Sequence, residues 1–98
     1  MDKKNRLFTL VDEILYYKWD PIAVSDSIAW RDEYHTYVPK ICEYLLSNQS
    51  QEYIAKHLYE LETSSMGLTV TDKFKEKHLK FLFKIASMLV ECKEYLEE

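Results

Sequence analysis

The chain has 98 residues and a formal net charge of −4, because 17 Asp and Glu outnumber 13 Lys and Arg. Its hydrophobic content of 47% and charged content of 31% suit a chain that buries a core, and they exclude a disordered tail. One glycine and two prolines argue against a turn-rich β-sandwich and against a glycine-cradled nucleotide fold. We expect a single domain over residues 1–98, and the acidic balance argues against a general nucleic-acid binder.

The N-terminal segment and the cysteines bear on compartment and metal content. Acidic residues interrupt the first apolar positions, and no apolar run approaches the roughly 20 residues of a membrane span. We therefore expect a cytoplasmic protein with no signal peptide and no membrane contact. Cys42 and Cys92 are then reduced thiols in small apolar sites. With these thiols, His35, His57 and His78 match no zinc-binding spacing, so we expect no metal and no cofactor.

The first predicted helix covers residues 4–18. One stripe of side chains recurs along it at helical spacing, namely Leu7, Leu10, Val11, Ile14 and Lys18. Asp20 followed by Pro21 ends this helix, because a residue before proline is pushed out of the α region. We expect residues 20–31 to form an ordered loop, pinned to the core by the flanking rings of Trp19 and Trp30.

The second helix has an ambiguous start. Pro39 lies among the apolar positions of its stripe, which are Tyr34, Tyr37, Val38, Ile41 and Leu45. Since proline is tolerated in a first helical turn, we place the start near Thr36 and assign residues 32–35 to a preceding turn. One longer helix kinked at Pro39 is the alternative.

The third predicted helix follows a break at residues 48–50. Ser50 is its expected N-cap, and Glu52 lies in its first turn, where the helix dipole favours negative charge. Gly67 is the expected left-handed residue after this helix, with Leu68 packing back against it. The apolar side of the helix contains Ile54, Leu58 and Leu61.

The fourth predicted helix is long, covering residues 72–96, and its apolar surface is unusually wide. The main stripe contains Phe74, His78, Phe81, Ile85, Leu89, Cys92 and Leu96. A second apolar row contains Leu79, Phe83, Ala86 and Val90. Such a helix is either central in the bundle or covered by another subunit, and we expect the second row to be a self-association or partner interface. The sequence thus predicts an all-α, four-helix bundle-like domain with a long C-terminal helix and an ordered loop over residues 20–31.

Three short motifs are shared with a known group of proteins. They are Trp19-Asp20-Pro21-Ile22-Ala23-Val24, then Asp32-Glu33-Tyr34 with Tyr37 and Pro39, and finally Met66-Gly67-Leu68. Over about residues 7–92 the chain resembles the YugE-like family, small bacterial proteins of unknown function with the pattern W-D-P-I-G-V, D-E-Y-D-x-Y and M-G-L. Ala23 replaces a glycine of that pattern, and His35 replaces an acidic residue. The resemblance implies a small α-helical cytosolic domain and carries no activity.

Eight residues around the expected loop and the second helix are candidate binding residues: Trp19, Asp20, Trp30, Asp32, Glu33, Tyr34, His35 and Tyr37. Carboxylates with an imidazole suit a divalent cation or acid–base chemistry, although acidic residues at helix ends more often serve as caps. The aromatic side chains suit a partner surface or a ligand groove, and they suit the wall of a small core equally well.

A row of lysines on the last helix is the remaining charged feature. Residues 73–84 carry five Lys and one Glu, a charge of +4, whereas residues 12–62 carry a charge of −6. The row lacks arginine and interleaved aromatic residues, so we expect a solvated helix face and hold a nucleic-acid contact as a weak alternative. No nucleophile elbow, P-loop or H-E-x-x-H motif occurs, so we assign no catalytic residue.

These features favour a non-enzymatic helical protein that acts through protein–protein contact, as an adaptor or immunity protein does, with a homodimer as one arrangement. The alternative is a small-ligand or metal-binding domain at the loop that contains Asp20, Asp32, Glu33 and His35. A partner module should expose an apolar patch larger than about a few hundred Å². A ligand binder should instead have a closed pocket near Trp19 and Trp30.

Overall fold

The computed structural model of the chain describes residues 3–19, 28–65 and 72–97. All of these residues are helical except the turn at 47–50. The elements in chain order are α1 (Lys3–Ile14), η1 (Leu15–Trp19), α2 (Ile28–Leu46), α3 (Gln51–Glu60), η2 (Leu61–Ser65) and α4 (Asp72–Glu97). Each η element is a π-helical turn that continues the α-helix before it. No strand occurs in the three described ranges, which confirms the all-α prediction with its long C-terminal helix.

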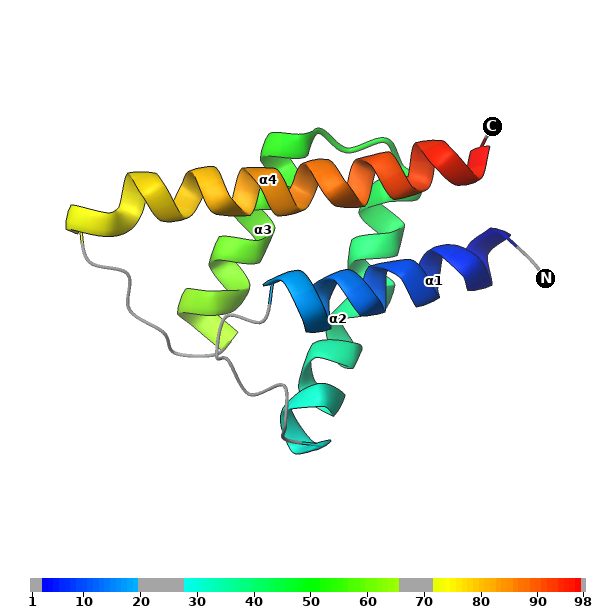
Figure 1. Ribbon diagram of the computed structural model, residues 1–98, viewed down its shortest axis with the longest axis horizontal. Helices are drawn as coiled ribbons and strands as arrows, with labels where there is room; N and C mark the ends of the chain where they lie inside the picture. Colours follow the sequence, from blue (N-terminus) through cyan, green and yellow to red (C-terminus); the bar gives the residue numbers. More distant parts are fainter. Residues whose placement is uncertain (1–2, 20–27, 66–71, 98) are drawn as a thin grey trace.

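The helices form two layers that cross at a large angle. Figure 1 shows α1 and α4 side by side and running in opposite directions, with α2 and α3 behind them. The molecule measures 42 × 29 × 18 Å along its principal axes. Because α4 packs against α1, α2 and α3, one side of this helix is central in the fold.

The core lies between these layers and receives side chains from every helix. Burial of each aliphatic side chain stabilises the fold by about 1.5–3 kcal/mol, so the shared cluster fixes how the helices pack. Its fully buried members at helical spacing are Val11 and Leu15, Val38 and Ile41, Ile54 and Leu58, and Leu82 and Leu89.

The stripe predicted for the first helix is correct as far as Ile14 and changes after it. Lys18 is exposed, and Leu15 and Trp19 are buried in its place. Hydrogen bonds in a π turn span five residues, so η1 takes up more residues per turn than α1. Within this turn the buried side therefore passes from Leu15 to Trp19, four residues later.

The second helix begins at Ile28, so both the predicted start near Thr36 and the predicted loop through residue 31 are wrong. The alternative of one longer helix that contains Pro39 gives the observed span. Pro39 cannot donate to the carbonyl of His35 four residues earlier. Both residues are exposed, so water can satisfy that carbonyl and the helix tolerates the proline. The remainder of the predicted loop, residues 20–27, lies outside the described residues.

The turn between α2 and α3 uses a left-handed asparagine. Asn48 has a φ of 59°, a region that asparagine tolerates better than most residues. Its N–H donates to the Leu45 carbonyl at 3.1 Å, and the next N–H, of Gln49, donates to the Tyr44 carbonyl at 3.0 Å. This pair of bonds is a Schellman motif, which satisfies the last carbonyls of α2 and confirms the predicted break.

The third and fourth helices begin where the sequence predicts. The Ser50 side chain accepts a hydrogen bond from the Tyr53 N–H at 3.1 Å, which confirms Ser50 as the N-cap of α3. The helix α4 spans Asp72–Glu97, within one residue of the prediction. The expected helix end at Gly67 and Leu68 lies outside the described residues.

The buried side of α4 runs between the two predicted apolar rows. Leu82, which belongs to neither row, is fully buried, whereas Phe74 and Phe81 of the main stripe are exposed. Apolar residues cover so much of this helix that periodicity alone does not determine which of its sides faces the core. Packing against the other helices determines it. The side that results contains Leu82, Ile85, Ala86, Leu89 and Leu96.

Candidate functional site

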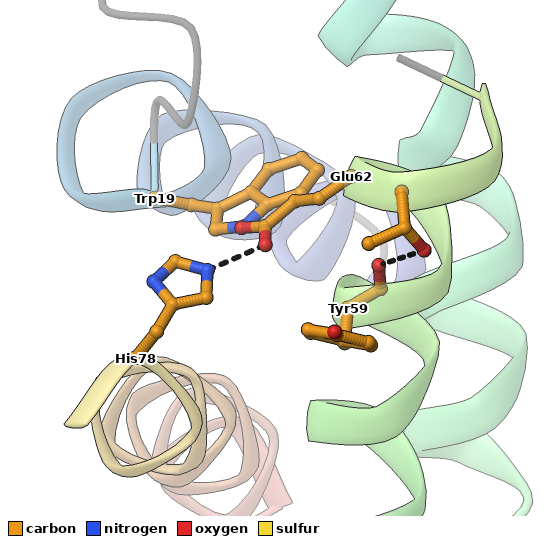
Figure 2. A network of polar contacts seen from close by, with 5 residues as sticks. Trp19, Tyr59, Glu62 and His78 are labelled. Carbon is orange, nitrogen blue, oxygen red and sulfur yellow. Dashed lines mark hydrogen bonds and ion pairs between the residues drawn. The ribbon is translucent and has the colours of Figure 1, made fainter. Parts of the chain in front are cut away.

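A buried carboxylate joins three elements of the fold. Glu62 in η2 is only 1% exposed. Its Oε2 accepts a hydrogen bond from Trp19 Nε1 at 2.9 Å, and its Oε1 lies 2.5 Å from His78 Nε2. Figure 2 shows the carboxylate between the indole and the imidazole, which approach it from η1 and α4. We call these three residues the Glu62 cluster.

The helical register of each element places these side chains in the interior. Glu62 follows Leu58 by four residues, so it continues the buried side of α3 into η2. His78 precedes Leu82 by four residues, so it lies on the buried side of α4, one turn nearer its start. Trp19 is the last residue of η1 and continues the buried side of α1. The cluster is therefore built from core positions.

Both oxygens of the Glu62 carboxylate have a donor, which is the condition for burying such a group. To donate through Nε2, His78 must carry a proton on that nitrogen, so Nδ1 is the ring atom left for a further interaction. Figure 2 shows the second ring nitrogen of His78 on the side away from Glu62. The His78 side chain is 26% exposed, so the pair holds an imidazole in one orientation at the edge of the core.

Trp19 also joins the predicted aromatic group to the core. Its ring centroid lies 5.7 Å from that of Tyr34 and 6.3 Å from that of Tyr37. Trp19 and Tyr34 are buried and Tyr37 is half-buried. Trp19 is buried, as the prediction requires, and these rings form part of the core wall. That Trp19 and Trp30 pin the loop to the core stays a prediction, because residues 20–27 and the Trp30 side chain lie outside the described structure.

The other predicted binding residues do not join the Glu62 cluster in the described structure. His35 is exposed, with Nδ1 3.1 Å from Asp12 Oδ1 and its ring edge-on to Phe8 at 5.1 Å. Of the predicted acidic loop site, His35 is the one residue whose side chain is described. The side chains outside the described part are those of Asp20, Trp30, Asp32 and Glu33.

Sequence reasoning missed two members of the cluster. It assigns no role to Glu62, and it considers His78 as a member of the apolar stripe and as a rejected zinc ligand, never as a partner of a buried carboxylate. A usable indication exists for Glu62, because a charged residue four positions after Leu58 falls on a side of the helix that is otherwise apolar. Such a residue requires a buried partner. No comparable pattern identifies that partner, because Trp19 and His78 are distant in sequence.

Exposed apolar side chains gather on α4. Among the described residues, eight large hydrophobic side chains are exposed, and five of them lie on this helix. The predicted interface row is divided, because Leu79 and Phe83 are exposed, Val90 is half-buried and Ala86 is fully buried. Ala86 is thus unavailable to a partner, since packing inside the monomer turns it inward, and this corrects the predicted interface. The five exposed residues are Phe74, Leu79, Phe81, Phe83 and Tyr95.

Two of the hollows that adjoin α4 bear on its exposed apolar residues. The first, of about 650 Å³, is lined by Asp72, Lys75, Glu76, Leu79, Lys80 and Phe83. The second, of about 420 Å³, lies between the first helix and α4 and is lined by Leu10, Glu13, Ile14, Tyr17, Lys18, Met88 and Cys92. Trp19 lines neither hollow. Both are open to solvent, whereas the small-ligand hypothesis predicts a closed pocket.

The two thiols are poor nucleophiles in this structure. Burial raises the pKa of the Cys42 thiol to about 11, so it is protonated at neutral pH. Burial, followed by the nearby carboxylate of Glu91, raises the pKa of Cys92. Among the residues with described positions, no group of three His, Cys, Asp or Glu side chains could hold a metal ion.

No protein-family model, curated protein or solved structure matches the chain. The resemblance to the YugE-like family therefore stays a prediction. In the described parts of the chain, none of the helices combines the length and apolar character that crossing a membrane requires.

Proposed function

We propose that the protein acts through protein–protein contact and that the outer side of α4 is its contact surface. The observation that carries the proposal is that, among the described residues, five of the eight exposed large hydrophobic side chains lie on this one helix, three on one flank of its buried side and two on the other. Aromatic side chains are enriched in interfaces, because they bury a large area at a small loss of conformational freedom. Single exposed apolar residues are ordinary, whereas Phe74, Phe81 and Tyr95 follow one another along one flank of this helix, as the residues of a binding surface do.

The position of α4 supports the same proposal. Figure 1 shows α4 in the layer nearest the viewer, with α1 beside it and α3 behind it. Its outer side is therefore not covered by another described helix. The Glu62 cluster lies on the inner side, so we give it a structural role in tying η1, η2 and α4 together, and we propose no catalytic residue.

Site-specific photo-crosslinking in cells that express the protein tests the proposal. A benzophenone amino acid replaces Phe81, Phe83 or Tyr95 on α4, and Tyr53 on α3 serves as an exposed aromatic control. We expect covalent adducts from the α4 positions and few from Tyr53. An absence of adducts from all three α4 positions, in protein that is folded by circular dichroism, would contradict the proposal. Adduct mass identifies whether the partner is a second copy or another protein.

A further inference from the structure

We infer that the partner of this surface is a second copy of the chain, docked along α4 with the two helices antiparallel. This inference rests on the proposed contact function and names the partner. The feature that carries it is a stripe on the outer side of α4 that is complementary to itself. The stripe consists of Phe81, Lys84, Met88, Glu91 and Tyr95.

The stripe has the spacing at which two helices pair lengthwise. Its members are separated by three, four, three and four residues, as in a heptad repeat, with apolar residues at 81, 88 and 95 and charged residues at the two positions between them. Phe81 is 40% exposed and Tyr95 is 67% exposed, and Met88 lies half-buried midway between them. An apolar residue at the centre with an aromatic residue at each end is a surface that gains from being covered.

The charges of α4 select the direction of pairing. Residues 73–84 carry five lysines and one glutamate, whereas residues 85–97 carry three glutamates and one lysine. That one lysine, Lys93, is already engaged by Glu97 at 3.3 Å and by Asn48. An antiparallel pair centred beside Met88 overlaps over residues 79–97, so Lys80 and Lys84 of each copy lie along the acidic C-terminal part of the other, and the lysines before residue 79 extend past its end. A parallel pair would set like charges together.

A two-fold axis beside Met88 aligns the members of the stripe. With a rise of about 1.5 Å per residue, Lys84 lies about 6 Å to one side of the axis and Glu91 about 4.5 Å to the other. Lys84 of each copy then faces Glu91 of the other copy. Phe81 and Tyr95 are each about 10 Å from the axis, so they meet in the same way. Every contact occurs twice, as a closed symmetric dimer requires.

The hollow between the first helix and α4 adds a place for an aromatic ring of the second copy. Its volume is about 420 Å³, and Met88 and Cys92 line it on the α4 side. Exposed Tyr17 lies at the same hollow, so apolar surface extends from the stripe onto the first helix. A partner docked along the stripe would bury this surface together with Met88.

A polyanion is a poorer occupant of the same surface. The lysines that would meet phosphates end at Lys84, and Glu91 and Glu94 follow on the exposed part of the helix. A nucleic acid lying along α4 would therefore meet repulsion over half of its length. A partner matches both parts of α4 only if it is acidic where α4 is basic and basic where α4 is acidic. A second copy of the chain in antiparallel orientation has this charge distribution.

Charge reversal combined with mixing tests the inference by sedimentation velocity over about 10–200 μM, a range suited to weak dimers. We expect the wild type to approach twice the 11.8 kDa chain mass. Lys84→Glu and Glu91→Lys should each weaken association by roughly tenfold or more, because each sets like charges opposite one another twice. An equimolar mixture of the two variants should restore the dimer, because opposite charges then face each other at both pairs. Lys56→Glu, on an exposed part of α3, is the control and should change nothing.

Three outcomes would overturn the inference. A wild type that stays monomeric over this range refutes self-pairing, and the photo-crosslinking then decides whether another protein occupies the surface. A dimer that both single variants leave intact lies elsewhere on the molecule. A dimer that both variants break and their mixture does not restore refutes the antiparallel arrangement. All three substituted positions are exposed, so the variants should keep the helical signal of the wild type.

Discussion

Two histidine–carboxylate pairs in this protein share their chemistry and differ in their surroundings. In the Glu62 cluster, the carboxylate is buried and the imidazole is 2.5 Å away. In the other pair, His35 is 53% exposed and lies 3.1 Å from Asp12. The Asp12 side chain is 13% exposed and that of Glu62 is 1% exposed, so water can still reach Asp12 when its imidazole partner is lost but cannot reach Glu62. The comparison teaches that burial, more than pairing, decides what the loss of one group does to the fold.

The pairs also differ in what they connect. Asp12 and His35 link α1 to α2, which already pack through apolar side chains. Glu62 links the end of α3 to both η1 and α4, and a third group, Trp19, shares its carboxylate. We therefore expect substitutions in the Glu62 cluster to weaken the packing of several elements at once.

The largest expected effect is that of Glu62→Ala. Removing the carboxylate leaves the Trp19 N–H and the His78 imidazole without their acceptor and opens a cavity in the core, which together should cost about 3–5 kcal/mol. His35→Ala removes the exposed pair and should cost about 1 kcal/mol or less. Urea unfolding followed by circular dichroism measures both. Equal losses for the two variants would break the comparison.

Trp19→Phe should have the next largest effect. Phenylalanine keeps an aromatic ring in the core but removes the donor to Glu62 Oε2, so a buried acceptor loses its partner. The expected loss in the free energy of unfolding is about 1–3 kcal/mol. The same urea titration measures it. A loss below about 0.5 kcal/mol would mean that the indole acts through its ring alone.

The N-cap hydrogen bond of α3 shows how much one exposed, local interaction contributes to the free energy of unfolding. Ser50→Ala removes the N-cap of α3 and should cost about 1 kcal/mol. Ser64→Ala, at another exposed serine, is the control and should stay within about 0.5 kcal/mol. If Ser50→Ala were as damaging as Glu62→Ala, the cap would matter as much as the buried cluster.

The smallest effect on stability is expected from a third histidine, His57. Its pKa is shifted mainly by burial, so it separates the effect of burial from that of pairing with a carboxylate. Burial lowers the pKa of His57 below its ordinary value of 6.5, against an opposing contribution from Glu60. Because the folded state binds this proton less readily than the unfolded state, stability is lost as the pH falls below about 6.5. We expect His57→Gln to reduce the fall in thermal midpoint between pH 7.5 and pH 5. An unchanged pH dependence would show that His57 is not responsible.

Most of the fold could be predicted from patterns among neighbouring residues. The cap at Ser50, the break at residues 48–50 and the bounds of α4 each follow from a few neighbouring residues, and each is confirmed. The start of α2 was not recovered, because tolerance of Pro39 depends on the exposure of His35, which is a property of the folded molecule. The rotation of α4 was not recovered for a related reason, since its neighbours choose among several apolar sides.

The candidate site was recovered only in part. Trp19 stood out as a large ring at a helix end, and its burial is confirmed. Glu62 and His78 did not, because their importance comes from a contact between residues 16 positions apart on different helices. Helical periodicity describes which side of one helix is buried, but it does not say which residue of another helix meets it there.

The π-helical turns bear on how the Glu62 cluster tolerates changes in chain length. Trp19 ends η1, and Glu62 lies in η2, so each belongs to a turn that holds more residues than an α turn does. Deleting one residue between positions 15 and 18 and closing that turn to ordinary α geometry rotate the following residue in opposite senses, so the two changes largely cancel. The indole would then stay on the side of the helix that faces Glu62. In an alignment of relatives, a one-residue gap at either turn should therefore be compatible with the cluster, whereas a one-residue gap inside α1 should rotate Trp19 by about 100° relative to the core residues before it and accompany loss of the cluster.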